Sequence, residues 1–218
     1  MITFDGVSKI YNLNGHEKVV IDELDMTFPY NRNLGILGHN GAGKSTLMRL
    51  IAGAELPTMG RIKRHVEISW PLGFGGGFNG NMTGLENIRF VARMYNENVS
   101  NMIGFVESFA ELGPSLEWPI QTYSSGMKAR LAFGVSMAVN FDCYLIDEIT
   151  AVGDSRFQQK CRDVFAEKLK RSKIIMVSHS SATLRKFCDA GCLLHQGKLV
   201  YFDDLEEAIA EHERLQQL

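Results

Sequence analysis

A glycine-rich segment with one lysine is the part of this sequence best suited to chemistry. It reads Gly38-His39-Asn40-Gly41-Ala42-Gly43-Lys44-Ser45 and matches the pattern G-x-x-x-x-G-K-[ST]. Glycines let the backbone wrap closely around phosphates, and the N-terminus of a following helix adds a positive dipole end. Lys44 supplies a charge to the β- and γ-phosphates, and the Ser45 hydroxyl can coordinate Mg²⁺. The segment therefore predicts a site for a nucleoside triphosphate such as ATP.

Two acidic residues end an apolar run, which reads Cys143-Tyr144-Leu145-Ile146-Asp147-Glu148. A buried strand that ends in Asp places a carboxylate at the C-terminal edge of a parallel sheet, where α/β proteins bind ligands. We expect Asp147 to hold Mg²⁺ through water and Glu148 to orient or deprotonate the attacking water. Taken alone, such a run is more often a solvated strand end, but next to a phosphate loop it predicts a hydrolytic site.

Two further segments have the right residue types for binding phosphate. Tyr123-Ser124-Ser125-Gly126 precedes an apolar helix, so it is either a second anion-binding helix terminus or a plain N-cap. Val177-Ser178-His179 follows another apolar strand and places His179 at the same sheet edge as Asp147. There His179 could contact the γ-phosphate or be structural. We expect the other histidines, including His212, to be structural or surface side chains.

The elements that must position these residues alternate between strands and helices. We expect a strand before the phosphate loop, a helix after it that stops at Gly53, a helical pattern from Leu85 to Gly113, and short strand segments within residues 1–35. Further along we expect these elements: a helix at Gly126–Val139, strands at Cys143–Ile146 and Ile174–Val177, a hairpin at Leu193–Phe202, and a last helix at Leu205–Leu215.

Alternating strands and helices predict an α/β fold with a mainly parallel sheet. We find no repeat or linker that divides the chain. We therefore expect one domain over residues 1–218, with a nucleotide-binding core at 1–84 and 127–218 and an inserted helical part at about 85–126.

Composition excludes several classes of protein. The chain has 218 residues, of which 45% are hydrophobic and 22% charged, so it can bury a core. Its net charge of −2 gives no general reason to expect nucleic-acid binding. Four cysteines are too few for a disulfide scaffold, and we expect them to be reduced thiols. We expect no secretory signal, because the N-terminus has neither a basic start followed by an apolar run nor a small-residue cleavage site. We expect no membrane-spanning segment, because the longest uncharged stretch, Ile68–Leu85, is rich in glycine.

With these motifs in this order, the chain resembles the nucleotide-binding subunit of ABC transporters over essentially its whole length. In that resemblance Gly38–Ser45 is Walker A, Cys143–Asp147 is Walker B, Glu148 is the catalytic carboxylate and His179 is the switch histidine. Tyr123–Met127 stands for the signature and Ala151–Asp154 for the D-loop. The resemblance also implies an antiparallel β subdomain, a helical subdomain, catalytic roles for Lys44, Glu148 and His179, and metal binding by Ser45 and Asp147. The residues that it implies for nucleotide contact are Tyr11 (stacked on adenine), Gly38, His39, Asn40, Gly41, Ala42, Gly43, Lys44, Ser45, Thr46, Ser124, Ser125 and Gly126.

Longer stretches narrow the resemblance to ATPases that export capsular polysaccharides, which are similar to exporters of O-antigen and teichoic acid. These stretches are ISWPLGFGGGFNGNMTGLENI, TYSSGMKARLAFGVSMA and DEITAVGDSRFQQKC. After Leu218 we expect no extra carbohydrate-binding domain of the kind that many O-antigen exporters carry, which favours the capsule type. The resemblance implies an ATP-hydrolysing homodimer that works with an integral membrane permease at the cytoplasmic face of the inner membrane. An ABC ATPase of another exporter, or a soluble ABC ATPase, remains the alternative.

The sequence departs from the family pattern in two places. No Gln occurs between Arg61 and Ile120, where the family has one in the loop after the β subdomain, and Asn79 and Asn81 are candidate replacements. In the signature, Ser125 replaces the second glycine and Met127 the terminal Gln. We also expect the loop Trp70–Gly84, with large apolar groups among glycines, to be the surface that couples to the permease. In the alternative, Trp70 and Phe74 fold back into the core.

Overall fold

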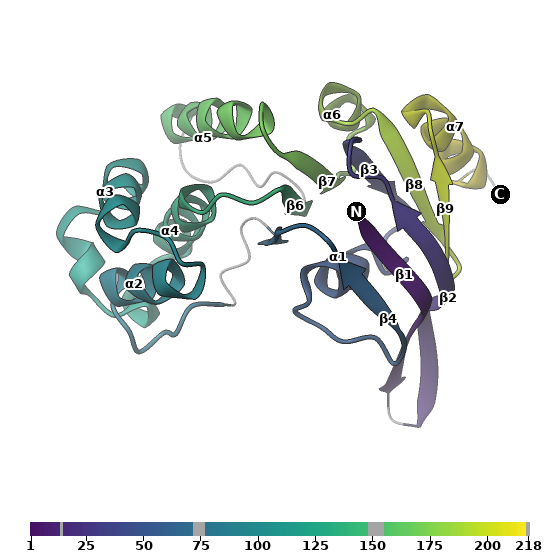
Figure 1. The fold of residues 1–218 in the computed structure, drawn as a ribbon, viewed down its shortest axis with the longest axis horizontal. Coiled ribbons are helices and arrows are strands. Elements are labelled where there is room, and N and C mark those ends of the chain that lie inside the picture. The colour runs from purple at the N-terminus through teal and green to yellow at the C-terminus, as the bar shows by residue number, and fades with distance from the viewer. Residues whose placement is uncertain (14, 72–76, 148–154, 217–218) are drawn as a thin grey trace. The chain divides into compact units, whose positions relative to one another are not determined.

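The computed structural model describes residues 1–13, 15–71, 77–147 and 155–216 of the chain. Its contacts define two compact units. The first contains Met1–Pro71, Phe141–Ile149 and Ser172–Leu218, and the second contains Leu72–Asn140 and Thr150–Arg171. The second unit is larger than the helical part expected at 85–126, because two later helices pack together with the helices of that segment. Figure 1 labels the α-helices of both units and the strands except β5.

A six-stranded sheet is the centre of the first unit. Its order is β5-β6-β7-β3-β8-β9, and every neighbouring pair is parallel except β8 with β9. This confirms the mainly parallel sheet. The strands are β3 (Leu34–Leu37), β5 (Ile68–Pro71), β6 (Cys143–Asp147), β7 (Lys173–Val177), β8 (Ala190–His195) and β9 (Lys198–Phe202).

An antiparallel sheet of order β2-β1-β4 completes the strands of this unit. Its strands are β1 (Ile2–Leu13), β2 (His16–Phe28) and β4 (Met59–Arg64). The sequence predicted short segments here, which was wrong, because β1 and β2 are long and paired throughout. Register shifts between Phe4 and Val7, and a positive φ of 45° at Glu23, interrupt the alternation by which a long strand is recognised.

Helix α1 (Lys44–Ala52) packs between the two sheets. Its buried Leu47, Leu50 and Ile51 belong to one core cluster with Phe4 of the small sheet and Leu145 of the large one. Two other helices, α6 (Ser181–Phe187) and α7 (Leu205–Gln216), cover the opposite face of the large sheet. A β-carbon on Gly35 of β3 would lie 3.2 Å from both Leu184 and Leu205, so these helices press closely on the sheet.

Helices build the second unit. The helical pattern expected at Leu85–Gly113 is confirmed and forms two α-helices, which are separated where Asn96 has a positive φ of 54° and Asn98 caps the second helix. The ring of Phe109 stacks against those of Phe105 and Phe133 and packs edge to face with Phe157. These four rings form a hydrophobic core cluster of this unit. The elements are α2 (Gly84–Met94), α3 (Val99–Ala110), the 3₁₀ turns η2 (Gly113–Glu117) and η3 (Ile120–Thr122), α4 (Ser125–Ala138) and α5 (Ser155–Leu169).

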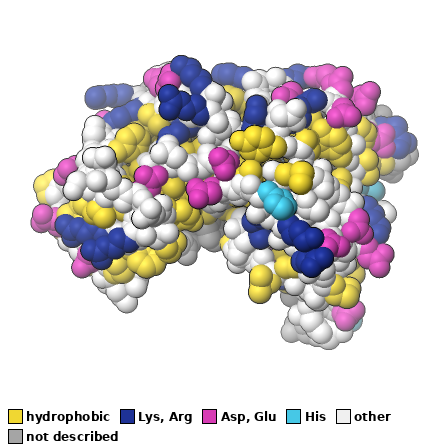
Figure 2. Space-filling model, viewed as in Figure 1, with side chains coloured by type: hydrophobic (Ala, Val, Ile, Leu, Met, Phe, Trp, Pro, Cys, Tyr) yellow, Lys and Arg dark blue, Asp and Glu magenta, His cyan; other side chains and the backbone are white. Residues whose placement is uncertain are grey.

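The surface carries charges of both signs. Figure 2 shows Lys and Arg side chains mixed with Asp and Glu side chains over one face of the molecule. Several of them form exposed ion pairs, such as Arg185 with Glu206 and Arg61 with Asp5. Among the described residues, no helix combines the length and the apolar character needed to cross a bilayer.

Candidate functional site

Three adjacent strands of the large sheet end at one place. Ile36 of β3 lies opposite Val177 of β7, and Val177 lies opposite Asp147 of β6. The glycine-rich loop starts two residues after Ile36, and His179 follows two residues after Val177. Because parallel strands share a C-terminal edge, the loop, Asp147 and His179 meet there, as the sequence predicted. They line a cleft of about 470 Å³.

The glycine-rich loop has a backbone that side chains would not tolerate. Gly38 has φ 149°, and a β-carbon there would lie 2.5 Å from the carbonyl oxygen of Leu194. Gly43 has φ 108°, and its β-carbon would lie 2.3 Å from Val20. Helix α1 begins immediately afterwards at Lys44, so its N-terminal N–H groups face the cleft that the loop encloses. The loop is therefore shaped to hold an anion against a helix N-terminus.

Lys44 is the buried cation of this cleft. Its ammonium group donates hydrogen bonds to the carbonyl oxygens of Gly38 and His39, and only 8% of the residue is exposed. Burial lowers the pKa of Lys44, and the nearby carboxylate of Asp147 opposes this shift. An anionic ligand in the cleft would oppose it further, so the lysine is suited to bind phosphate.

Oxygen donors for a divalent cation lie in the same cleft. The hydroxyl of Ser45 and the carboxylate of Asp147 both line it, next to Thr46 and Lys44. Hydroxyl, carboxylate and phosphate oxygens are the ligands that Mg²⁺ prefers. The residues present therefore fit a magnesium ion bound together with a nucleotide phosphate. Glu148, and the segment 151–154 expected as the D-loop, lie outside the described residues.

Tyr11, near the end of β1, also lines the cleft. Its hydroxyl donates to the carboxylate of Glu55 at 2.6 Å. Two cleft residues on β2, Lys18 and Val20, were missed by the sequence analysis. Lys18 is the direct partner of Tyr11 across the hairpin. The signal was therefore present in the pairing of β1 with β2, once these strands are recognised as long.

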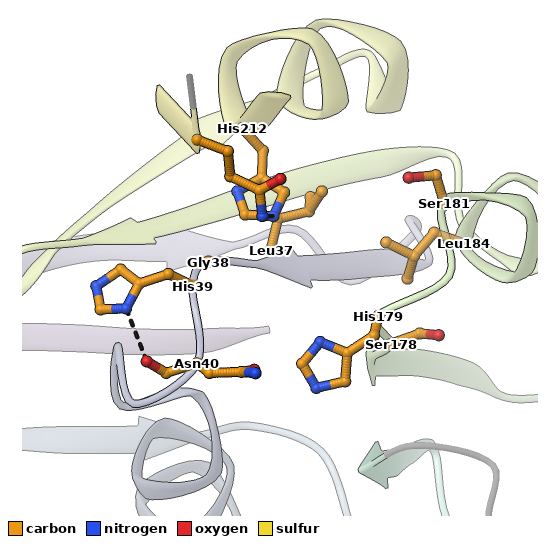
Figure 3. A pocket seen from close by; sticks show the side chains of 10 residues that line it. Leu37, Gly38, His39, Asn40, Ser178, His179, Ser181, Leu184 and His212 are labelled. Carbon is orange, nitrogen blue, oxygen red and sulfur yellow. Dashed lines mark hydrogen bonds between the residues drawn. The ribbon is translucent and has the colours of Figure 1, made fainter. Parts of the chain in front are cut away.

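A second, smaller cavity of about 160 Å³ adjoins the start of the glycine-rich loop. Figure 3 shows three histidines around it, from the loop (His39), the end of β7 (His179) and helix α7 (His212). Burial lowers the pKa of His212, and the positive charge of Lys44 acts in the same direction. From the sequence we expect His212 to be a structural or surface residue, because nothing near it in the sequence indicates that α7 returns to this loop.

The segment Ser124–Gly126 belongs to the second unit and is exposed at the start of α4. The hydroxyl of Ser124 accepts a hydrogen bond from the backbone N–H of Met127, so Ser124 is the N-cap of the helix. Ser125 is the first residue of α4 and not the residue before it. A role for these residues in binding nucleotide stays a prediction.

Part of the loop expected to couple to the permease is regular structure. Trp70 lies in β5, and its ring packs against the ring of Phe141 in a T-shaped arrangement with the centroids 5.4 Å apart. This agrees with the alternative expectation that Trp70 folds back into the core. Phe78 is half-buried in the second unit, and residues 72–76 lie outside the described part of the chain. The proposed coupling role is therefore restricted to the remainder of the segment and stays a prediction.

Asn79 and Asn81, the candidate replacements for the missing Gln, belong to one hydrogen-bonded group with a third asparagine, Asn87. The backbone N–H of Asn79 donates to the side chain of Asn87, whose amide group donates back to the carbonyl oxygen of Asn79. The side chain of Asn79 accepts from the backbone of Asn81. Asn87 is 1% exposed and was missed by the sequence analysis, although an Asn among the apolar residues of a helix is a signal of such a role.

Comparison with known proteins identifies the family. The model of the ABC transporter family matches residues 21–151. The chain is 49% identical over 208 residues to the capsule polysaccharide export ATP-binding protein CtrD of Neisseria meningitidis serogroup B, covering 95% of this chain and 96% of that protein. It is 46% identical over 217 residues to the ATP-binding protein BexA of Haemophilus influenzae, covering both chains fully. The chain belongs to the ABC transporter family.

A solved ABC structure agrees in fold. The ATP-binding cassette MJ0796, described as dimeric and bound to ADP and phosphate, superposes with a TM-score of 0.73 at 18% sequence identity, covering 92% of this chain and 98% of that one. The chain is therefore an ATPase of the ABC type, as the sequence predicted.

Proposed function

We propose that this chain hydrolyses ATP to power the export of a lipid-linked capsular polysaccharide through a separate membrane permease. The match that carries the proposal is the one to CtrD and BexA, because it extends over nearly the whole of all three chains at almost half identity. The permease would hold the chain at the cytoplasmic face of the inner membrane.

In the proposed reaction the residues of the cleft bind and orient the triphosphate. Lys44 and the N–H groups of the glycine-rich loop compensate its charge. Ser45 and Asp147 would hold Mg²⁺, which supplies further charge stabilisation for the transferring phosphoryl group. His179, which follows β7 and lines the cleft, would contact the γ-phosphate, and Glu148 would activate the water. Glu148 would accept a proton from the water, and the resulting nucleophile would attack the γ-phosphate and displace ADP.

We propose that two chains act together as a homodimer on ATP binding. Each chain contains one phosphate loop and one exposed Ser124–Gly126 segment. In a head-to-tail dimer the segment of one protomer would close on the γ-phosphate held by its partner, with the first turn of α4 as the anion-binding element. The dimeric solved neighbour supports this arrangement.

The export function is tested by complementation. Deletion of the gene in the native host should abolish surface polysaccharide, and the wild-type chain should restore it. Glu148→Gln should fail to restore export although its purified protein binds ATP, because the carboxamide keeps the shape of the side chain but cannot accept the proton. Normal surface polysaccharide in the deletion strain contradicts the proposed substrate. Near-normal ATP turnover by Glu148→Gln contradicts the role of that residue.

The permease is tested by co-purification. A tagged chain extracted from membranes in mild detergent should bring an integral membrane protein with it, and the deletion of that protein should reproduce the export defect. If export survives without the membrane protein recovered in this way, that protein is not the partner.

A further inference from the structure

The carboxylate of Glu55 is the centre of a hydrogen-bonded network beside the nucleotide cleft. It accepts from the hydroxyl of Tyr11 at 2.6 Å, from the ammonium of Lys9 at 2.9 Å and from the guanidinium of Arg49 at 3.0 Å. Of these four residues, Tyr11 alone lines the cleft. Tyr11 is therefore the member of the network that can itself meet a ligand in the cleft.

The end of helix α1 brings Glu55 to this place. Helix α1 stops at Ala52, and Gly53 adopts a left-handed φ of 76°. The backbone N–H groups of Ala54 and Glu55 then both donate to the carbonyl oxygen of Arg49, which turns the chain back along the helix. Because these are backbone bonds, the position of the carboxylate is set by the helix that carries the phosphate loop at its other end.

Arg49 connects the same network to the phosphate loop. Its guanidinium donates to Glu55 and, at 3.1 Å, to the hydroxyl of Thr46. Thr46 lines the cleft two residues after Lys44. Arg49 also donates to the hydroxyl of Tyr11 at 3.4 Å, and the hydroxyls of Tyr11 and Thr46 lie 3.5 Å apart. Tyr11 on β1 and Thr46 on α1 are thus held to each other both directly and through the two charged side chains, although they are far apart in the sequence.

Lys9 determines which face of the Tyr11 ring is available. Its ammonium lies over the ring, 5.0 Å from the centroid, and is held there by Glu55 and by the carbonyl oxygen of Leu56. A planar base can therefore stack on the opposite face of the ring. A cation over one face also withdraws electron density from the ring, which favours stacking of an electron-rich purine on the other face.

The carboxylate of Glu55 is ionised at neutral pH. Burial opposes its ionisation, but the hydrogen bonds from Tyr11, Lys9 and Arg49 outweigh burial and lower its pKa to about 2. Its side chain is 21% exposed, so the charge is partly shielded from water and the three donors are well ordered around it.

We propose that Glu55 is a positioning residue that fixes the Tyr11 ring as a platform for the nucleobase, while Arg49 keeps that platform in register with the phosphate loop. This inference rests on the proposed binding of ATP in the cleft. It predicts that loss of the network weakens binding of the base without weakening binding of the phosphates.

Two ligands that differ in the base test this prediction. ATP carries the base, and inorganic tripolyphosphate carries the phosphate chain alone; both are titrated with Mg²⁺ against the purified full chain by calorimetry. Glu55→Ala and Tyr11→Phe should each raise the Kd for ATP about three- to tenfold and leave that for tripolyphosphate within about twofold. The double variant should bind ATP about as weakly as either single variant, because both remove the same contact. Asp5→Asn, which removes a surface ion pair on the same strand, is the matched control and should change neither.

The outcomes separate the inference from the proposed function. Equal weakening of ATP and tripolyphosphate would show that Glu55 acts on the fold of the loop and would overturn the inference, as would unchanged ATP binding in both variants. If Glu55→Ala does not fold, Tyr11→Phe decides alone, since it removes only a hydroxyl. A wild-type chain that binds neither ligand overturns the nucleotide site itself, and the inference with it.

Discussion

A buried lysine is costly unless acceptors surround its ammonium, and Lys44 has two carbonyl acceptors from its own loop. These bonds hold the side chain within the loop, so that the arriving phosphates meet a cation that is already oriented. Lys44→Ala should therefore raise the Kd for ATP about 10- to 100-fold, the effect of losing a charged hydrogen-bond donor. Equilibrium titration measures it, with the exposed Lys170→Ala as the control. Similar affinities for the two variants would contradict this role.

The ionised state of Glu55 also makes a prediction about stability. The folded-state pKa is about 2 and the reference value is 4.5, so the stabilisation is complete above the reference value and is lost as the pH falls from 4.5 towards 2. Glu55→Gln cannot gain this stabilisation. Urea denaturation of the wild-type chain and of Glu55→Gln should give a difference in free energy of unfolding that is constant above about pH 5 and shrinks below it. A difference that stays constant down to about pH 3 would show that the charge is not the cause.

The elements differ in how well the sequence predicts them, for physical reasons. Strands β6 and β7 are buried on both faces and read as continuous apolar runs, and α1 has Gly53 as a clear stop. Their positions, and so the meeting of Lys44, Asp147 and His179, followed from the sequence alone. The long strands β1 and β2 did not, because bulges break their alternation.

The parts of the site that were missed depend on long-range packing. Lys18 enters the cleft only through the pairing of β1 with β2, and His212 reaches its cavity only because α7 packs on the large sheet. Glu55 has no motif around it, and its role comes from a turn at the end of α1. Such contacts join residues that are distant in the sequence, so no local pattern encodes them.

Helix α2 offers a test of local capping at the scale of one element. The hydroxyl of Thr83 accepts from the backbone N–H of Glu86, and the carboxylate of Glu86 accepts from the backbone N–H of Thr83, which is a complete capping box. Thr83→Ala should reduce the free energy of unfolding by about 1 kcal/mol. Ser100→Ala, in the exposed first turn of α3, is the control and should cost less. Equal losses in urea denaturation would mean that the box does not stabilise α2.

At the scale of the whole molecule, the groups proposed to bind phosphate belong to two different units of the chain. The glycine-rich loop, Asp147 and His179 belong to the first unit, and Ser124–Gly126 belongs to the second. Both sets contain a helix N-terminus. The proposed homodimer gives the second set a use, because each nucleotide would then meet donors from two protomers and ATP would act as part of the interface.

Cysteine crosslinking distinguishes a shared site from two separate ones. In the proposed dimer Ser125 of one protomer approaches Asn40 of its partner when ATP is bound, so a chain with Ser125→Cys, Asn40→Cys and Glu148→Gln should form a disulfide-linked dimer when oxidised with ATP. The reach of a disulfide, about 4.4–6.8 Å between α-carbons, makes the result specific.

The native cysteines should interfere little with this measurement. Burial raises the pKa of Cys143, Cys188 and Cys192 to about 12 and that of Cys161 to about 11, so all four remain largely protonated and react slowly at neutral pH. The chain that carries only Glu148→Gln is the control, and it should stay monomeric on a non-reducing gel. Adding Lys44→Ala to the double-cysteine chain should strongly reduce the crosslink at an ATP concentration that just saturates the parent chain, since ATP then binds about 10- to 100-fold more weakly. A bond that forms within one chain, or one that forms equally without nucleotide, would contradict a shared site.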